Sequence, residues 1–180
     1  MPFINTEIPD LKVFEPNLWQ DERGYFFEAY NVHTFQQAGI AATFVQDNQA
    51  RSTYGVLRGL HYQIAPFAQA KLVRVVEGEV LDIAVDIREG SPTFGKWYSI
   101  RLSAANKRQL FVPRGFAHGY VVLSETAEFF YKCDNFYSKA HEGGIRWDDP
   151  TLNIDWEIVA DRIKLSEKDR ALPLFGMHSM

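Results

Sequence analysis

The chain has 180 residues, of which 46% are hydrophobic and 14% aromatic, so it is long and apolar enough for one domain with a substantial core rather than a disordered or fibrous protein. Its formal net charge of −4 argues against general nucleic-acid binding, although a local basic pocket would still suit a small anion. Cys133 is the only cysteine, and we find neither a signal peptide nor an apolar run of about 18 residues, so we expect a cytoplasmic protein that does not enter a membrane.

The first third of the chain predicts short strands and one short helix. Residues 11–14 are β-like, and a turn at 21–24 leads into an aromatic strand from which three side chains project: Arg23, Phe26 and Glu28. Asn31 is a candidate N-cap for a helix over 33–38, which Gly39 ends. Residues 44–52 form a polar strand with Gln46 and Asn48 on one face and Asp47 on the other.

The centre of the chain predicts two strands, 55–63 and 69–78, that carry four basic side chains among apolar neighbours: Arg58, His61, Lys71 and Arg74. Cationic side chains are rarely buried without a partner. Either these four face solvent on a sheet, or they line a polar pocket inside a β fold.

Residues 79–88 alternate strictly, with one apolar face and another face that carries Asp82 and Asp86. Further strands are predicted at 97–102, on both sides of a bend at 113–115, and at 127–134, which contains Tyr131. Residues 142–150 are predicted to be a loop, and one or two Ser-capped helical turns are predicted over 165–173. About ten short strands and two short helices indicate one all-β domain over residues 1–180, a sandwich or a barrel.

Residues 113–118 match the second half of the cupin signature, Pro-x-Gly-x-x-His, and this raises the question of a metal site. The first half of the signature should supply two histidines and a carboxylate. This chain instead has His61, Gln63 and Lys71 at those positions. A fixed ammonium would repel a divalent ion, and a competent site needs three or four protein ligands. We therefore expect the cupin-like jelly-roll shape with short peripheral helices, but no metal.

The same residue types suit proton transfer next to a carbonyl group. Histidine is the residue type best suited to act as a general base near neutral pH, so His61 could remove the proton, and Lys71 could stabilise a developing enolate oxygen. Tyr131 could return a proton from the other face, and Asp169 could orient the imidazole of the base. Arg23, Phe26, Arg58 and Tyr62 are too few for a nucleic-acid groove, but could hold a nucleoside diphosphate.

Eight motifs, in order along nearly the whole chain, resemble those of the dTDP-4-dehydrorhamnose 3,5-epimerase family: Asp21–Glu28, Gln46–Asn48, Gly55–Gln63, Lys71–Val73, Ser91–Gly95, Pro113–Tyr120, Tyr131–Lys132 and Trp147–Pro150. The resemblance implies a jelly-roll homodimer that exchanges N-terminal strands and uses neither a metal nor an organic cofactor. The implied reaction is epimerisation of dTDP-4-dehydro-6-deoxy-D-glucose at C3 and C5.

The resemblance also implies a role for individual residues. His61 resembles the proton acceptor, Asp169 its partner, Tyr131 the proton donor, and Lys71 the residue near the sugar's C4 oxygen. His118 resembles a pocket histidine, and Phe26 and Tyr137 resemble stacking and lining residues. The other positions that resemble binders of the nucleotide sugar are Arg23, Glu28, Gln46, Asp47, Asn48, Arg58, Glu142 and Lys168.

Three alternatives stay open at the level of sequence. A related enzyme that epimerises only C3 or only C5, or a ketoisomerase of the same scaffold, could carry the same base and acid. A sugar-nucleotide-binding cupin without catalysis would bind dTDP but exchange no protons. A metal-dependent cupin is the third alternative.

Overall fold

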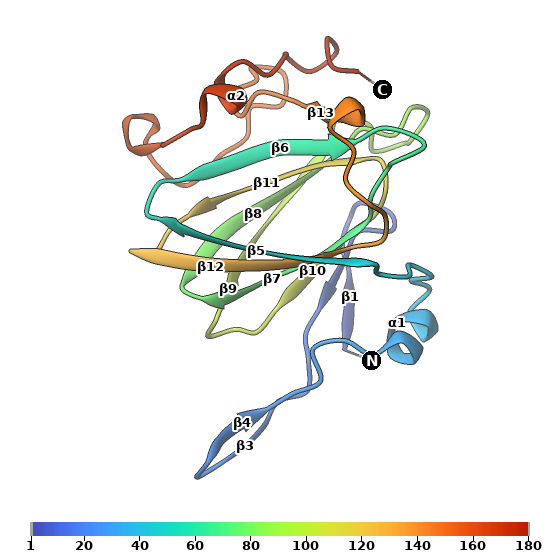
Figure 1. Cartoon of the computed structure of the whole chain (residues 1–180), viewed down its shortest axis with the longest axis vertical. Coiled ribbons are helices and arrows are strands. Elements are labelled where there is room, and N and C mark those ends of the chain that lie inside the picture. Colours follow the sequence, from blue (N-terminus) through green and yellow to red (C-terminus); the bar gives the residue numbers. More distant parts are fainter. Residues whose placement is uncertain (1, 180) are drawn as a thin grey trace.

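The computed structural model describes residues 2–179 as two antiparallel β-sheets packed face to face (Figure 1). One sheet contains, in spatial order, β1 (Phe3–Asn5), β2 (Lys12–Phe14), β10 (Gln109–Val112), β7 (Lys71–Glu77), β12 (Thr126–Cys133) and β5 (Gln46–Thr53). The other contains β13 (Glu142–Gly144), β6 (Leu57–Gln63), β11 (Phe116–Val122), β8 (Glu79–Asp86) and β9 (Trp97–Ser103). From β5 to β13 the chain changes sheet at every connection except β8 to β9, which gives the jelly-roll topology expected from the sequence.

A two-stranded hairpin, β3 (Trp19–Asp21) and β4 (Gly24–Phe26), extends away from both sheets (Figure 1). The short helices are α1 (Val32–Gln37), for which Asn31 accepts the capping hydrogen bond as predicted, and α2 (Glu167–Arg170). Two 3₁₀ turns lie at Lys139–His141 and Ala160–Arg162. No helix within residues 2–179 has the length and apolar character of a membrane span.

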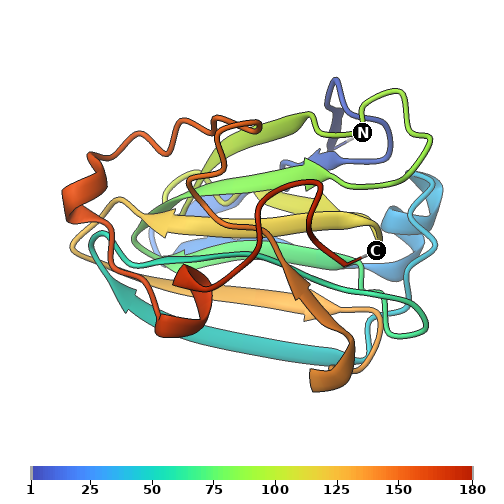
Figure 2. The same cartoon turned by 90° about the horizontal axis from the view of Figure 1, so that it is seen from above.

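Alternation along β8 explains how both of its faces become buried. Val80 and Ala84 pack between the sheets, whereas Leu81 and Ile83 pack on the outer face against buried side chains of the C-terminal segment. That segment runs across the sheet containing β6, β11 and β8 (Figure 2). The apolar face predicted for β8 is confirmed, and the acidic face turns out to point into the interior, where both aspartates are fully buried.

The prediction of a loop over 142–150 is wrong at its start, where Glu142–Gly144 forms β13 on the edge of β6. Two adjacent glycines give no β-propensity signal, because they have no side chain to pack on a sheet. The pairing depends on their small size: a Cβ on Gly143 would lie 2.4 Å from the ring of Tyr62. Tertiary packing therefore selects this strand against its local propensity.

Candidate functional site

An irregularity in β6 brings its two cationic side chains to the same face of the sheet. His61 pairs with His118 of β11, and Arg58 pairs with Tyr120, so three steps along β6 match two steps along β11. The extra residue is a β-bulge at Gly59, which has φ +135° and approaches Gly119 so closely that a Cβ would lie 2.5 Å from its Cα. Without this bulge, Arg58 and His61 would lie on opposite faces.

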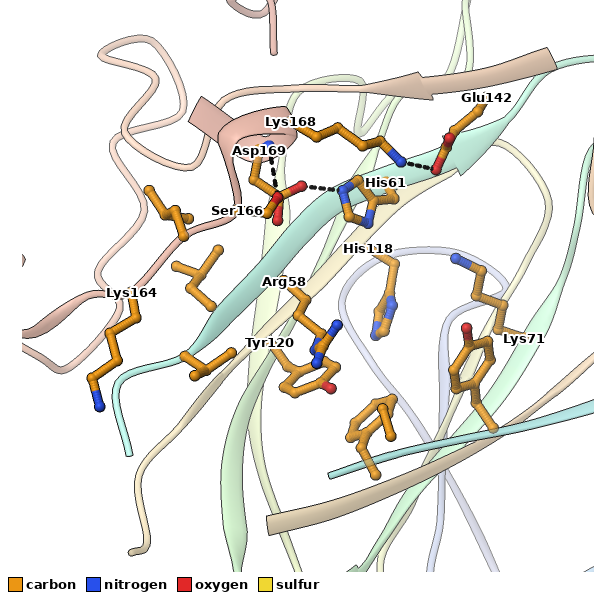
Figure 3. A pocket seen from close by; sticks show the side chains of 16 residues that line it. Arg58, His61, Lys71, His118, Tyr120, Glu142, Lys164, Ser166, Lys168 and Asp169 are labelled. Carbon is orange, nitrogen blue, oxygen red and sulfur yellow. Dashed lines mark hydrogen bonds and ion pairs between the residues drawn. The ribbon is translucent and has the colours of Figure 1, made fainter. Parts of the chain in front are cut away.

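A cavity of about 560 Å³ lies between the two sheets at this point, and Figure 3 shows Arg58, His61 and His118 projecting into the same space. Lys71 of β7 and Tyr131 of β12 line it from the opposite sheet, and the stretch from Lys164 to Asp169 covers one side. A second hollow of about 280 Å³ shares four of its lining residues: His61, Lys71, Tyr131 and Glu142. The two hollows form one cleft, so the polar-pocket alternative is the correct one for three of the four basic residues.

Arg74 is the exception among the four. Its guanidinium lies 5.0 Å from the centre of the Phe130 ring on the outer face of its sheet, and it does not line the cavity. The odd spacing between Lys71 and Arg74 on a regular strand places them on opposite faces.

His61 and Asp169 form a close pair at the covered side of the cavity. Nε2 of His61 lies 2.5 Å from Oδ1 of Asp169, and Ser166 caps α2 by accepting a hydrogen bond from the Asp169 backbone N–H. Burial favours the neutral acid, but the hydrogen bond and charge of His61 outweigh it and lower the pKa of Asp169. An ionised Asp169 fixes Nε2 as the protonated nitrogen, which leaves Nδ1 of His61 as the free lone pair.

Tyr131 and Lys71 face His61 from the other sheet. Burial raises the pKa of Tyr131 to about 12, so the phenol keeps its proton at neutral pH and is able to act as an acid. Burial lowers the pKa of Lys71, and the nearby Cys133, Asp82 and Glu142 oppose that effect. The site therefore contains a carboxylate-oriented imidazole, a protonated phenol and a buried amine around one cavity.

His118 has a carboxylate partner of its own beneath the cavity. Its Nε2 lies 2.9 and 3.0 Å from the two carboxylate oxygens of Asp82. Burial raises the pKa of Asp82, while the charges of His118 and Lys71 and the hydrogen bond of His118 act in the opposite direction.

Polar side chains at the mouth of the cleft form two hydrogen-bonded groups. Glu142 accepts hydrogen bonds from Lys168 at 2.5 Å and from the Tyr137 hydroxyl at 3.0 Å. Gln46 and Asn48 line the second hollow and hydrogen-bond to each other. The structure thus gathers most of the sequence-predicted binding residues around the cleft.

Four predicted binding residues lie elsewhere in this protomer. Asp47 lies on the opposite face of β5 from its two neighbours and pairs with Lys132 at 2.9 Å. Arg23, Phe26 and Glu28 are exposed on or beside the projecting hairpin and do not line the cavity. The side chain of Arg23 pairs with Asp21 of the same hairpin.

Sequence reasoning left out several residues that line the cavity: Ala50, Val56, Leu57, Tyr120, Phe129, Lys164 and Leu165. Tyr120 and Phe129 stack with their ring centres 4.0 Å apart and form an aromatic wall. Nothing in the sequence marks these two as lining residues, because inward aromatic side chains on a strand are the usual core pattern.

Within residues 2–179, no group of three His, Cys, Asp or Glu side chains converges in the manner of a metal site. Each pocket histidine instead has one aspartate partner. The donor set available around the cavity is therefore short of what a divalent metal requires.

Comparison with known proteins gives consistent results. The family model described as dTDP-4-dehydrorhamnose 3,5-epimerase matches residues 5–176. The enzyme of that name from Shigella flexneri is 58% identical over 170 residues, which cover 94% of this chain and 93% of the relative.

Solved structures resemble the chain over nearly its whole length. The crystal structure of dTDP-4-dehydrorhamnose 3,5-epimerase from Elizabethkingia anophelis has a TM-score of 0.94 and 55% identity, covering 97% of this chain and 96% of that one. The crystal structure of the dTDP-6-deoxy-D-glucose-3,5-epimerase of Legionella pneumophila, in complex with dTDP-4-keto-L-rhamnose, has a TM-score of 0.93 and 50% identity. The match covers 97% of this chain and 93% of that one.

Proposed function

The chain belongs to the dTDP-4-dehydrorhamnose 3,5-epimerase family, and on that premise we propose that it is the isomerase that converts dTDP-4-dehydro-6-deoxy-D-glucose to dTDP-4-dehydro-L-rhamnose. The observation that carries the proposal is the placement of base and acid on opposing sheets. His61 comes from β6 and Tyr131 from β12, and both line the same cavity. A sugar ring between the sheets meets a base on one face and an acid on the other, which is what inversion of a carbon centre requires.

Proton removal is assigned to His61. Nδ1 takes the proton from C5 and from C3, because Asp169 occupies Nε2. The electron pair of the broken C–H bond moves into the bond toward C4, and the C4 oxygen becomes an enolate oxygen. No organic cofactor is needed, because the substrate's own ketone accepts that electron pair.

Lys71 and Tyr131 complete the reaction in this proposal. The Lys71 ammonium stabilises the enolate oxygen from a buried position, where a charge acts more strongly than it does in bulk water. The Tyr131 phenol then donates its proton to the opposite face of the carbon and restores the ketone, with inverted configuration at that centre.

Arg58 and the mouth residues are assigned to the nucleotide. Arg58 lies in the cleft without a carboxylate partner among the described residues and donates only to Ser52, so its charge is available for the diphosphate. Tyr137 is exposed and tethered to Glu142, where it can stack on the thymine base. Gln46, Asn48, Lys168 and His118 are assigned to the remaining polar contacts of the nucleotide sugar.

We also infer a homodimer in which the β3–β4 hairpin of one protomer reaches the cavity of its partner. The hairpin exposes three large aromatic side chains, Trp19, Tyr25 and Phe26, the last with 68% of its surface accessible. Trp19 and Phe26 lie side by side with their ring centres 6.0 Å apart, and such an exposed apolar surface on a projecting arm indicates contact with another protein surface. Arg23, Phe26 and Glu28 would then bind substrate in the partner's cavity. The buried, free thiol of Cys133 is consistent with the proposed cytoplasmic location.

The test is NMR of dTDP-4-dehydro-6-deoxy-D-glucose incubated with the protein in D₂O. We expect deuterium at both C3 and C5, with the L-lyxo product trapped by a reductase. Deuterium at only one carbon would identify a mono-epimerase, and dTDP binding without any exchange would identify a binding protein and refute the proposed reaction.

A further inference from the structure

Asp82 is a buried acid beneath the cavity to which the reaction described above gives no role. Its side chain has no accessible surface, and both carboxylate oxygens face a single ring nitrogen, Nε2 of His118. It comes from the inward face of β8, while His118 comes from the neighbouring β11. An ionised carboxylate in such a place is costly unless nearby charges and hydrogen bonds compensate for it.

Asp86, four residues along the same face of β8, shows how this strand satisfies a carboxylate that is purely structural. It accepts hydrogen bonds from Arg88, Ser91 and Thr93, and the Arg88 guanidinium supplies the compensating charge. Asp82 has no arginine and no hydroxyl donor among the described residues. Its compensation comes from His118 and from the charge of Lys71 across the cavity.

Lys71 has the complementary deficit. It has no ion pair within residues 2–179, although its amine is buried in the cleft. The groups that face it are Asp82 from β8, His118 from β11, His61 from β6, Tyr131 and Cys133 from β12, and Glu142 from β13. Among the carboxylates in this set, Glu142 already pairs with Lys168, so Asp82 is the one whose charge is not committed to another lysine or arginine.

We propose that Asp82 is a positioning residue for the epimerisation: it holds His118 with its proton on Nε2, and it supplies the buried negative charge that keeps the Lys71 ammonium protonated over the C4 oxygen. Lys71, Asp82 and a neutral His118 together carry no net charge, which is the least costly state for a buried cluster. Nδ1 of His118 then keeps a lone pair that can accept a hydrogen bond from a sugar hydroxyl. Asp82 acts through these two residues and does not touch the substrate.

This inference deepens the proposed function and rests on it, so its first test is kinetic. Asp82→Asn keeps the shape of the side chain but removes its charge. We expect kcat to fall by roughly 10-fold or more, as for other residues that orient a reacting group, with little change in KM. The alkaline limb of the pH profile of kcat/KM should move to lower pH, because Lys71 without its counter-charge loses its proton more easily.

Asp86→Asn is the matched control, since it removes a buried carboxylate from the same face of the same strand without touching the cavity. Asp86→Asn should leave kcat, KM and the alkaline limb of the kcat/KM profile unchanged, although it lowers the stability of the fold. A fall in kcat for Asp82→Asn with an unmoved alkaline limb would mean that Asp82 only supports the fold, and would overturn the proposal.

A second measurement uses the unmodified protein and does not depend on turnover. The ¹⁵N shifts of the His118 ring, assigned by the signal that disappears in His118→Gln, should show a proton on Nε2 and a lone pair on Nδ1. A ring protonated at Nδ1 alone would refute the inference. If the protein exchanged no substrate protons at all, the proposed function would fail, whereas this spectrum would still decide the tautomer that Asp82 imposes.

Discussion

Three buried aspartates of this chain behave differently because their neighbours differ. Asp169 is held ionised by a histidine, Asp86 by an arginine and two hydroxyl groups, and Asp82 has only His118 and the charge of Lys71. Burial acts on all three in the same direction, toward the neutral acid. The partner therefore decides whether the carboxylate orients a base, anchors a loop or balances a charge.

At this scale, the roles of His61 and Tyr131 can be separated. We expect His61→Ala to lower turnover about 10²–10⁴-fold, because the general base is lost, and to stop deuterium exchange with it. Tyr131→Phe should instead reduce product formation more than exchange, since proton removal by His61 survives. The measurement is exchange and product formation in the same D₂O sample; equal losses of both in Tyr131→Phe would show that Tyr131 is not the acid.

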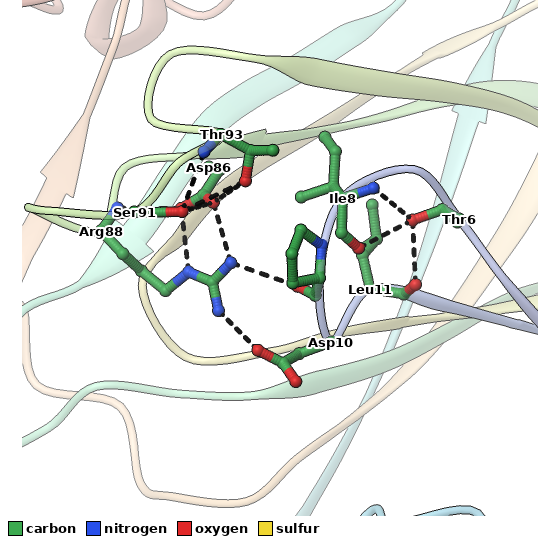
Figure 4. A network of polar contacts seen from close by, with 9 residues as sticks. Thr6, Ile8, Asp10, Leu11, Asp86, Arg88, Ser91 and Thr93 are labelled. Atoms are coloured by element: carbon green, nitrogen blue, oxygen red, sulfur yellow. Dashed lines mark hydrogen bonds and ion pairs between the residues drawn. The ribbon is translucent and has the colours of Figure 1, made fainter.

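Asp86 predicts how the stability of the protein depends on pH. Burial alone would raise the pKa of Asp86, but its hydrogen bonds with Arg88, Ser91 and Thr93 lower it to about 2 from 3.8 (Figure 4). A lowered folded-state pKa stabilises the native state above pH 3.8, and this contribution of about 2 kcal/mol disappears as the pH falls toward 2.

We therefore expect Asp86→Asn to lower the free energy of unfolding at pH 7 by about 2 kcal/mol and to flatten its decline between pH 4 and pH 2. Denaturant unfolding across that pH range measures both effects. Asp148→Asn is the control: its ion pair with Arg146 is exposed at the surface, so stability should change by no more than about 0.5 kcal/mol. An equally steep acid decline in Asp86→Asn would contradict the assignment.

At the scale of elements, β6 is the strand on which the site depends. One face packs Leu57, Leu60 and Tyr62 against the C-terminal segment, and the other presents Arg58 and His61 to the cavity. The bulge at Gly59 allows both arrangements. Its extra residue shifts the alternation of side chains by one position, so Arg58 and His61 point to the same face of the sheet. Loss of the bulge would force one of these two cations into the apolar layer.

We expect Gly59→Ala to destabilise the protein by about 1–3 kcal/mol and to lower activity as well. A Cβ there would lie 2.5 Å from the Cα of Gly119 and 2.9 Å from the His118 carbonyl oxygen, so the two strands must move apart. Gly90→Ala is the control, because it also has positive φ but nothing within 4 Å. Similar losses in the two variants would mean that only backbone strain matters at Gly59.

At the scale of the whole molecule, the jelly roll places chemically different groups on two sheets that face each other. The sheet containing β6 and β11 supplies the imidazoles, and the sheet containing β7 and β12 supplies the amine and the phenol. The polar network of Figure 4 also links the two layers at one end, since Arg88 after β8 binds Asp10 and the carbonyl of Pro9 before β2. The side chains of both strands of the projecting hairpin are exposed in one protomer.

The proposed exchange of hairpins predicts complementation between two defective proteins. We expect Arg23→Ala alone to raise KM and His61→Ala alone to be nearly inactive. In a mixed dimer, one cavity then combines an intact His61 with an intact Arg23 from the partner's hairpin. Refolding the two variants together should restore turnover with the KM of the unmodified protein, whereas a hairpin that serves its own cavity would give no such recovery.

Much of the fold was predictable because it depends on local patterns. Strict alternation identified β8, and Asn31 and Ser166 were identified as helix caps. The ordered motifs identified the family, and with it most of the polar side chains gathered around the cleft.

Long-range pairing determined the rest. Residues 142–144 form a strand only because β6 offers them an edge, and Arg58 and His61 share a face only because Gly59 of β6 bulges against Gly119 of the neighbouring β11. Likewise, alternation places Asp82 on one face of β8 but cannot say that this face points inward toward His118. Side-chain periodicity is a property of one strand, whereas register, bulges and the choice of the buried face depend on the neighbouring strands.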